Sequence, residues 1–293
     1  MSTMRAVVWE GPGVPMRVEE IPAPRPGAGE VLVRIAATGV CHTDLHVIKG
    51  EVAFPAPGVL GHEISGHVQE LGEGVEGFAV GERVVGAFIM PCGRCHPCEA
   101  GRDDLCATFF AENRLRGNLF DGTSRLTRQD GSRLSMYSMA GLAELAVVPA
   151  TALTHLPDEL PLEESAVLGC AAFTAYGALA RAHEDVRGRA VIVVAVGGVG
   201  SAVVQLARHL GASPVVAVDV DDDKLALAST LGADVVINSR TTDARQAAEG
   251  AFDVRRAVTR RFDLDEAPLA YDLLDAGQIR GRAIVTTSTS EAT

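Results

Sequence analysis

The first half of the chain alternates short apolar runs with turns rich in glycine and proline. The runs at residues 6–9, 31–35, 67–70 and 83–87 have the length and the boundaries typical of β-strands. Seven glycines lie between residues 61 and 86, a density that suits tight turns and bulges and disfavours regular helix. The pattern predicts a mostly β, barrel-like domain from about residue 4 to residue 149.

After residue 157 the pattern changes to helices and continuous apolar strands. An alanine-rich segment, residues 163–181, has apolar positions at helical spacing. The unbroken apolar run at residues 191–196, bounded by glycine, predicts a strand buried on both faces. Apolar positions then recur at helical spacing up to Leu210, and Gly211 is placed to end that helix.

The same alternation continues along the chain and predicts a parallel sheet. We expect a strand at 214–219, a helix at 221–231 ending at Gly232, and a short strand at 234–237. Together with the preceding strand and helix these form a βαβαβ unit. For the tail, the pattern predicts a helix over 265–276 closed by Gly277 and a strand over 282–285.

Composition narrows the class of protein. The 293 residues, 47% of them hydrophobic, are enough for about two domains with cores of their own. With 26 basic and 38 acidic residues the formal net charge is −12, which argues against a broad basic face for nucleic acid. No apolar run approaches the ~18 residues of a membrane span, and the start does not read as a signal peptide. We therefore expect a cytoplasmic protein without a membrane partner.

Four of the six cysteines form one cluster. Cys92, Cys95, Cys98 and Cys106 follow the spacing C-x2-C-x2-C-x7-C. In reducing cytosol clustered thiols favour metal binding over disulfides. Four thiolates close a tetrahedron around zinc and leave no open position, which describes a structural site. Another metal or an iron–sulfur cluster, and unmetallated reactive thiols, are the alternatives.

The other two cysteines, Cys41 and Cys170, are far apart in the sequence. With His62 they would complete the two-cysteine, one-histidine set of a catalytic zinc that keeps a position for water or substrate. Each residue also has a plainer interpretation. A lone cysteine is often a small core residue, and a lone histidine is often a hydrogen-bonded turn residue.

The strand predicted at 191–196 leads into Gly197, Gly198, Val199 and Gly200, which open a helix. Glycines at such a turn let a pyrophosphate approach the helix N-terminus, although a packed strand-to-helix turn also uses glycine. Asp219 closes the second strand, where a carboxylate bonds the ribose 2′-hydroxyl and repels a 2′-phosphate. The pattern favours NAD over NADP.

The first glycine of the fingerprint is replaced by Ala195. An alanine costs about 1 kcal/mol or more of stability where φ is positive.

Several strings together resemble the medium-chain zinc-dependent alcohol dehydrogenase family. The zinc signature Gly61-His62-Glu63-Ile64-Ser65-Gly66 is accompanied, in the family's order and at about its spacing, by the segment from Cys41 to Asp44, the four-cysteine lobe, the segment from Asp121 to Arg125 and the glycine turn. The resemblance extends over residues 4–238 and resumes at about residue 253.

The resemblance implies a fold and a division into domains. The fold class is α/β plus β, with a GroES-like mostly-β catalytic domain and a truncated Rossmann-type parallel-sheet domain. We expect the catalytic domain at residues 1–157, with the structural zinc lobe at about 90–110. The dinucleotide-binding domain is expected at 158–253 and a return to the catalytic domain at 254–293.

The resemblance also implies a role for individual residues. Cys41, His62 and Cys170 would hold a catalytic zinc, with Glu63 behind the metal and Asp44 on the second nitrogen of His62. Thr43, the cofactor ribose and then His46 would relay the proton of the alcohol, and Phe88 would line the substrate pocket. The residues implied as cofactor contacts, besides the glycine turn and Asp219, are Lys224, Thr174, His42 and Arg282.

One departure from the family affects the expected activity. Between residues 234 and 255 there is room for only a short strand and one helix, so the second half of the dinucleotide fold is missing from the pattern. The sheet would then have an uncovered edge beside residues 191–196. Three functions remain. The first is an NAD-dependent zinc alcohol dehydrogenase that acts on a small alcohol or aldehyde, and members of this family are homo-oligomers. The second is a zinc-folded but catalytically impaired binding or regulatory protein, and the third is a zinc hydrolase, for which the motif offers no second general base.

Overall fold

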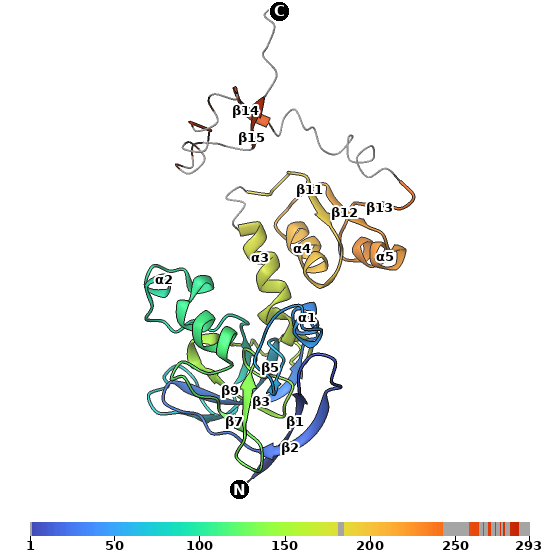
Figure 1. Ribbon diagram of the computed structural model, residues 1–293. Helices are drawn as coiled ribbons and strands as arrows, with labels where there is room; N and C mark the ends of the chain where they lie inside the picture. Colours follow the sequence, from blue (N-terminus) through green and yellow to red (C-terminus); the bar gives the residue numbers. More distant parts are fainter. Residues whose placement is uncertain are drawn as a thin grey trace, which may run out of the picture. The chain divides into compact units, whose positions relative to one another are not determined.

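The computed structural model describes residues 2–180, 185–242, 258–263 and 282–286, and six single positions between 266 and 278. The chain forms two compact units, residues 1–180 and 181–293. Each unit has its own sheets (Figure 1). The division between domains at residue 157 stays a prediction.

The first unit contains most of the strands. Its elements are β1 (Thr3–Trp9), β2 (Arg17–Pro22), β3 (Glu30–Thr38), α1 (His42–Ile48), β4 (Gly58–Val59), β5 (Ile64–Leu71), β6 (Arg83–Gly86), α2 (His96–Glu99), η1 (Asp103–Leu105), η2 (Phe109–Arg114), β7 (Leu126–Thr127), β8 (Arg133–Met136), β9 (Leu145–Pro149), η3 (Ala150–Ala152), β10 (Leu153–His155), η4 (Glu164–Gly169) and α3 (Ala171–Ala180).

Two five-stranded sheets build the mostly β domain that the first half of the sequence predicts. One has the order β2-β1-β4-β8-β7 and the other the order β10-β6-β5-β3-β9. Their inward side chains form one apolar core that includes Val33, Val68, Leu134 and Val147, each fully buried or nearly so. No helix interrupts the glycine-rich stretch from residue 61 to residue 86, which confirms that expectation.

A buried asparagine holds the loop that follows β8. Asn113, on the single π-helical turn η2, donates from Nδ2 to the carbonyl oxygens of Asn118, Met136 and Ser138, at 3.0–3.1 Å. Its Oδ1 accepts the N–H of Ser138 at 2.9 Å. Ser138 and Ala140 both have positive φ, 51° and 53°, a conformation that a side chain disfavours. The asparagine therefore compensates for a strained loop.

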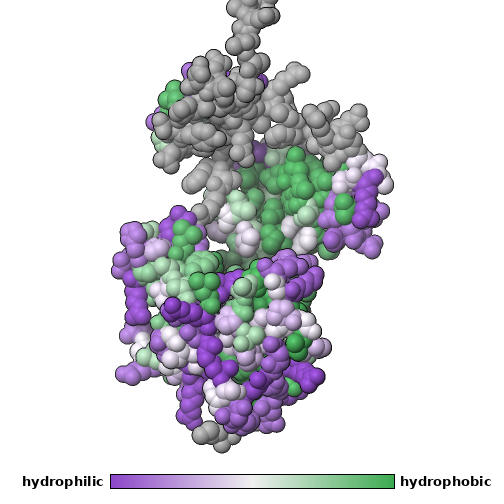
Figure 2. All heavy atoms as spheres, viewed as in Figure 1, coloured by the Kyte–Doolittle hydropathy of each residue, from purple (hydrophilic) through white to green (hydrophobic). Residues whose placement is uncertain are grey.

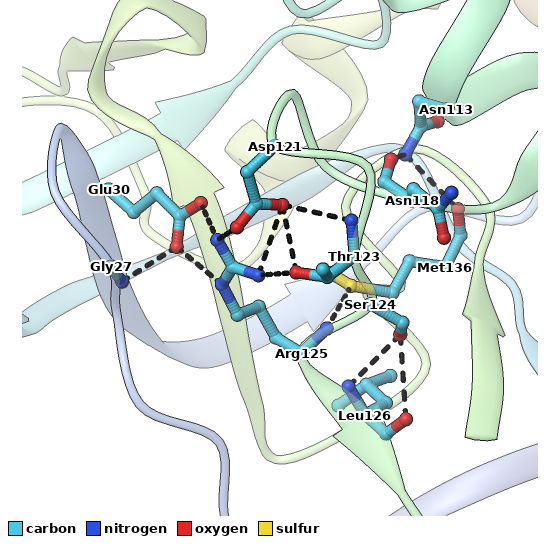
Figure 3. Close-up of polar contacts among 10 residues, drawn as sticks. All are labelled: Gly27, Glu30, Asn113, Asn118, Asp121, Thr123, Ser124, Arg125, Leu126 and Met136. Carbon is cyan, nitrogen blue, oxygen red and sulfur yellow. Dashed lines mark hydrogen bonds and ion pairs between the residues drawn. The ribbon is translucent and has the colours of Figure 1, made fainter.

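A second polar network ties the segment from Asp121 to Arg125 to the start of β3 (Figure 3). Arg125 makes two bonds to Glu30, from Nη2 at 2.6 Å and from Nε at 2.8 Å, and two to Asp121, from Nη2 at 2.8 Å and from Nη1 at 3.3 Å. Glu30 also accepts the N–H of Gly27 at 2.7 Å. Because both charged partners are largely buried, this two-bond geometry fixes position as well as charge.

The second unit contains β11 (Val191–Val194), α4 (Gly198–His209), β12 (Val215–Asp219), α5 (Asp222–Thr230), β13 (Val235–Asn238), β14 (Val258–Asp263) and β15 (Arg282–Thr286). The first three strands pair in parallel in the order β11-β12-β13. This confirms the predicted βαβαβ unit. Gly211 and Gly232 have φ of 85° and 110°, as residues that end helices in the left-handed region commonly do.

The prediction that residues 191–196 are buried on both faces is wrong for β11. Val194 is 75% exposed, whereas every residue of β12 is buried. The reason is position in the sheet, because β11 is an edge strand that pairs only with β12 among the described residues. Within the described ranges β11 thus has an unpaired edge, and the expected absence of the second half of the dinucleotide fold stays a prediction. Figure 2 shows a broad apolar area on this unit beside polar residues of α5.

Parts of the tail lie outside the described residues. Most of the segment from 234 to 255 cannot be compared, because residues 243–257 are outside the described ranges. The helix expected over 265–276 cannot be compared either, because only isolated positions of that segment are described. The final strand is confirmed as β15, which pairs in parallel with β14. Among the described residues no helix has the length and apolar character needed to cross a bilayer.

Replacing Asn113 should destabilise the first unit. In Asn113→Ala three carbonyl oxygens and one N–H lose a buried partner, and each such loss costs about 1 kcal/mol or more. We expect a loss of about 2–4 kcal/mol in the free energy of unfolding, measured by urea denaturation followed by tryptophan fluorescence. The exposed change Gln69→Ala serves as a control, and equal stability of the two variants would contradict the bracing role of Asn113.

Candidate metal centres and cofactor turn

The four cysteines of the lobe converge on one point. The sulfur atoms of Cys92, Cys95, Cys98 and Cys106 all lie within 4.8 Å of one another. Cys95 Sγ is 3.5 Å from Cys98 Sγ and 3.9 Å from Cys106 Sγ. A tetrahedron with Zn–S bonds of ~2.3 Å has edges of about 3.8 Å, whereas a disulfide needs about 2.05 Å. The thiol set therefore fits a zinc ion.

Backbone N–H groups donate to sulfur atoms of this lobe, although burial still raises the pKa of Cys98 and of Cys106. Cys106 Sγ accepts from the N–H of Cys92 at 3.2 Å and from the N–H of Phe109 at 3.4 Å. The N–H of Cys98, with further N–H and thiol donors, lowers the pKa of Cys95 to about 6. Zinc binds thiolates, so these donors suit the same ligand set.

The second group of donors comes from three separate segments. Cys41 is the N-cap of α1, His62 and Glu63 lie between β4 and β5, and Cys170 lies between η4 and α3. One ligand atom from each of these four residues lies within 4.8 Å of every other. His62 is fully buried and Glu63 nearly so. Residues that are 129 positions apart in the sequence thus meet at one site.

Asp44 and two thiols surround the imidazole of His62. Asp44 Oδ2 lies 3.0 Å from His62 Nδ1, and Asp44 Oδ1 accepts the N–H of Gly61 at 3.1 Å. Both ring nitrogens of His62 are buried, and neither has a hydrogen-bond partner of ordinary geometry among the described residues. Nδ1 faces the carboxylate of Asp44, whereas no carboxylate of the described residues forms such an ion pair with Nε2. A buried ring nitrogen without a partner is costly, so Nε2 suits a metal ion.

The pKa values of the two thiols and the imidazole are shifted in different directions. The neighbouring Cys170 thiol, followed by the His62 imidazole, lowers the pKa of Cys41 to about 3, and the pKa of Cys170 is raised because Cys41 is the thiol of the pair that ionises first. Burial opposes the charged form of His62, but Asp44 and Cys41 outweigh it and raise its pKa to about 9. Burial also raises the pKa of Glu63. The site is therefore built for an anionic sulfur, which a dication would bind in place of the proton.

An apolar cavity of about 430 Å³ adjoins this group of donors. Cys170 and Phe88 line it, together with Val85, Leu168, Phe173 and Thr174. The ring centroid of Phe88 lies 4.5 Å from that of His62. Two acidic residues of the lobe, Asp103 and Asp104, also contribute to the wall of the cavity. The cavity has the size and the lining of a site for a small apolar molecule.

Of the predicted proton-relay residues, Thr43 lies beside Cys41 and His46 lies further along α1. The N–H of Thr43 donates to Cys41 Sγ at 3.5 Å, and that thiol is 3.5 Å from Thr43 Oγ1. His46 lies one turn along α1, half exposed, with Nδ1 against the carboxylate of Glu51. His42, the first residue of α1, has its ring centroid 6.5 Å from that of His46. Their roles stay predictions.

In the second unit, the turn between β11 and α4 carries a strained alanine. Ala195, which stands where the fingerprint has its first glycine, has φ of +71° and so adopts the left-handed conformation that favours glycine. Gly200 has no room for a side chain, because a Cβ there would lie 2.1 Å from the carbonyl oxygen of Ala195. A Cβ at Gly197 or Gly198 would meet nothing within 4 Å, which leaves open space at the N-terminus of α4.

Asp219 is held at the carboxyl end of β12. Its Oδ2 accepts the N–H of Val196 at 2.7 Å, and its Oδ1 accepts the N–H groups of Val220 and Asp221 at 2.7 and 3.1 Å. These three bonds, first that from Val196, keep the pKa of Asp219 below its usual range. The carboxylate is thus ionised and fixed beside the glycine turn.

The remaining predicted cofactor residues are divided between the units. His42 and Thr174 belong to the first unit, and Lys224, on α5, and Arg282, the first residue of β15, belong to the second. Their joint contact with a cofactor stays a prediction.

Sequence reasoning missed two residues beside the second group of donors. Tyr137 is fully buried, and its ring meets that of His62 edge to face at a centroid distance of 6.1 Å. Asn113 shapes the loop that carries Tyr137. Neither has a signal in the sequence, because a single asparagine or tyrosine gains its role only from contacts across the fold.

Two family models match the chain. Residues 27–158 match the alcohol dehydrogenase GroES-like domain, and residues 198–259 match the zinc-binding dehydrogenase family. The two matched segments overlap the units that carry the cysteine sites and the glycine turn, respectively.

Solved structures agree with the family models. An alcohol dehydrogenase zinc-binding domain protein from Burkholderia ambifaria is 36% identical, with a TM-score of 0.78 over 85% of this chain and 67% of that one. Benzyl alcohol dehydrogenase from Acinetobacter calcoaceticus is 29% identical, with a TM-score of 0.80 over 100% and 79%. Acetophenone reductase from Geotrichum candidum, solved in complex with NAD, is 32% identical, with a TM-score of 0.66 over 81% and 64%.

The family, the fold class and the oxidoreductase type predicted from the sequence are thereby confirmed. The chain belongs to the medium-chain, zinc-dependent alcohol dehydrogenase family.

Proposed function

We propose that this chain transfers a hydride between an alcohol or aldehyde and NAD(H), with a catalytic zinc at Cys41, His62 and Cys170 and a structural zinc at the four-cysteine lobe. One observation carries the proposal. A histidine nitrogen, a carboxylate and two sulfurs from three distant segments meet within 4.8 Å beside an apolar cavity. Such a set of soft and borderline donors suits zinc.

Bound zinc would supply a Lewis acid for the substrate oxygen, and bound NAD would supply the hydride acceptor. The chain's own residues prepare the site. Asp44 orients the ring of His62, which fixes the nitrogen that faces the two sulfurs. Glu63, whose pKa is raised by burial, lies among the ligands and would adjust the negative charge around the metal.

The proton of the alcohol needs a route to solvent. The hydroxyl of Thr43 beside Cys41 would accept it while passing its own proton to the cofactor ribose, and half-exposed His46 would take the proton from the ribose to water. Histidine suits this step because its ordinary pKa lies near neutrality.

Asp219 and the glycine turn support NAD as the cofactor. The fixed carboxylate would accept a bond from a ribose hydroxyl and would repel a 2′-phosphate. The space at Gly197 and Gly198 would take the pyrophosphate at the N-terminus of α4. Lys224, His42, Thr174 and Arg282 are proposed as further contacts.

The cavity favours an apolar substrate. Its wall is formed largely by Phe88, Phe173, Leu168 and Val85, and its volume of about 430 Å³ is enough for a benzyl-sized alcohol. Relatives named for benzyl alcohol and acetophenone support the same class.

A second function is favoured by the small sheet of the second unit. The described part of that unit has three paired strands around the glycine turn, a strained Ala195 and an exposed Val194. Loose holding of the nicotinamide would lose the close approach that hydride transfer needs. The alternative is therefore a zinc-folded, catalytically impaired family member that acts as a binding or regulatory protein.

Zinc content should separate the two sites. We expect about two zinc ions per chain by elemental analysis, and about one in each of Cys98→Ser and Cys170→Ser. Cys98→Ser should also lower the melting temperature, because a structural site contributes to folding. Cys170→Ser should abolish turnover while it retains the lobe zinc. Full zinc content in both variants would contradict the proposed ligand sets.

Replacing Ala195 by glycine should relieve the positive φ. We expect Ala195→Gly to gain about 1 kcal/mol in stability, because glycine adopts this conformation without strain. NADH affinity, measured by the fluorescence of the bound nucleotide, should stay the same or improve. Gly200→Ala is the matched opposite change, since its Cβ would overlap a backbone oxygen. A lower free energy of unfolding in Ala195→Gly would contradict the inference that Ala195 is strained.

NADH production with benzyl alcohol tests the activity itself. The zinc-loaded chain should form NADH from benzyl alcohol, and NADPH from NADP at least about 10-fold less efficiently, as expected for a carboxylate facing a 2′-phosphate. His62→Ala should remove the activity. Two zinc ions per chain with NADH binding but no turnover on primary, secondary or aromatic alcohols would favour the impaired family member.

A further inference from the structure

Helix α1 ends in a turn that folds back on His46. The N–H of Gly50 donates to the carbonyl of Val47, and the N–H of Glu51 donates to the carbonyl of His46, both at 2.9 Å. Gly50 has φ of +75°. These two bonds around a left-handed glycine define the Schellman end of a helix.

This turn places two particular side chains together. In a Schellman motif the residue after the glycine contacts the residue five positions earlier, and that pair is commonly apolar. Here the two positions are Glu51 and His46, and Glu51 Oε2 contacts His46 Nδ1. The contact therefore follows from the backbone of the turn, although both side chains are about half exposed.

The charges around the pair are consistent with an anionic carboxylate. The hydrogen bond from His46 lowers the pKa of Glu51, and Lys49 adds a smaller effect in the same direction.

Gly50 could not be replaced without disturbing the turn, because its φ is positive and a Cβ would lie 2.9 Å from Pro12.

We propose that Glu51 is a positioning residue for His46: it accepts the Nδ1–H of the neutral imidazole and so keeps Nε2 free to receive the proton that leaves the substrate. The inference rests on the proposed function, in which His46 is the outer member of the relay. The partner of one ring nitrogen decides which tautomer a histidine adopts.

The proton balance of this step is simple. One proton arrives at Nε2 of neutral His46, and the Nδ1 proton stays in its bond to Glu51. The resulting imidazolium is next to a carboxylate, which stabilises its charge. The imidazolium then releases the Nε2 proton to water and returns to the starting tautomer, so Glu51 is unchanged over the cycle.

The tautomer of His46 can be measured without turnover. Long-range ¹H–¹⁵N NMR spectra of the zinc-loaded full chain, at about pH 9 where imidazole is neutral, report which nitrogen carries the proton. His46→Gln assigns the signal. We expect Nδ1–H in the natural protein and a shift of the proton towards Nε2 in Glu51→Ala, with Glu51→Gln between them because its amide oxygen still accepts.

Kinetics then test whether Glu51 acts through His46. Glu51→Ala should lower kcat about two- to five-fold, in line with an exposed charge pair. In the His46→Gln background the same change should have no further effect. Glu76→Ala, an exposed glutamate of the same unit, is the matched control and should change neither the tautomer nor kcat.

The outcomes test the role of Glu51 and the proposed function separately. A natural protein with the proton on Nε2, or a tautomer unaltered in Glu51→Ala, overturns the role of Glu51 whatever the turnover. The role of Glu51 is also overturned if Glu51→Ala lowers kcat by the same factor in the His46→Gln background as in the natural protein. Absent turnover with the expected tautomers contradicts the proposed function and leaves the positioning of His46 by Glu51 supported.

Discussion

The candidate metal site depends on a fully buried imidazole. His62 has no solvent to satisfy its ring nitrogens, so each must find a partner inside the protein. Asp44 takes Nδ1, and Nε2 is left among Cys41, Cys170 and Glu63. This single constraint explains why a helix N-cap, a link between two strands and the entry to another helix are brought to one place.

The rest of the first unit keeps that arrangement rigid. The loop after β8 holds two residues with positive φ, and Asn113 satisfies the polar groups that this conformation turns inward. Tyr137, on the same loop, packs its ring against His62. Strained backbone near a functional group is stable only where the surroundings over-determine it. Here the π-helical turn and the buried asparagine fulfil that condition.

The second unit shows the opposite balance. Its βαβαβ core has a fully buried central strand and a carboxylate fixed by three N–H groups, so the cofactor turn is well defined. Its edge strand, however, leaves Val194 exposed, and Ala195 is in a conformation better suited to glycine. Exposed apolar edges and local strain both lower stability. The proposed metal site and the proposed dinucleotide site therefore have different structural support in this chain.

Patterns within a few residues were readable from the sequence, and contacts between distant residues were not. The period of apolar positions predicted four strands of the first unit and the βαβαβ core of the second, and the C-x2-C-x2-C spacing predicted the lobe, because these depend on local geometry. The convergence of Cys41, His62 and Cys170 came only from resemblance to a family. The burial of β11 was predicted wrongly, since a strand's apolar run does not say whether a neighbour covers it. The positive φ of Ala195 and the roles of Asn113 and Tyr137 were decided by tertiary structure, because each arises from backbone and side chains that meet only after the chain has folded.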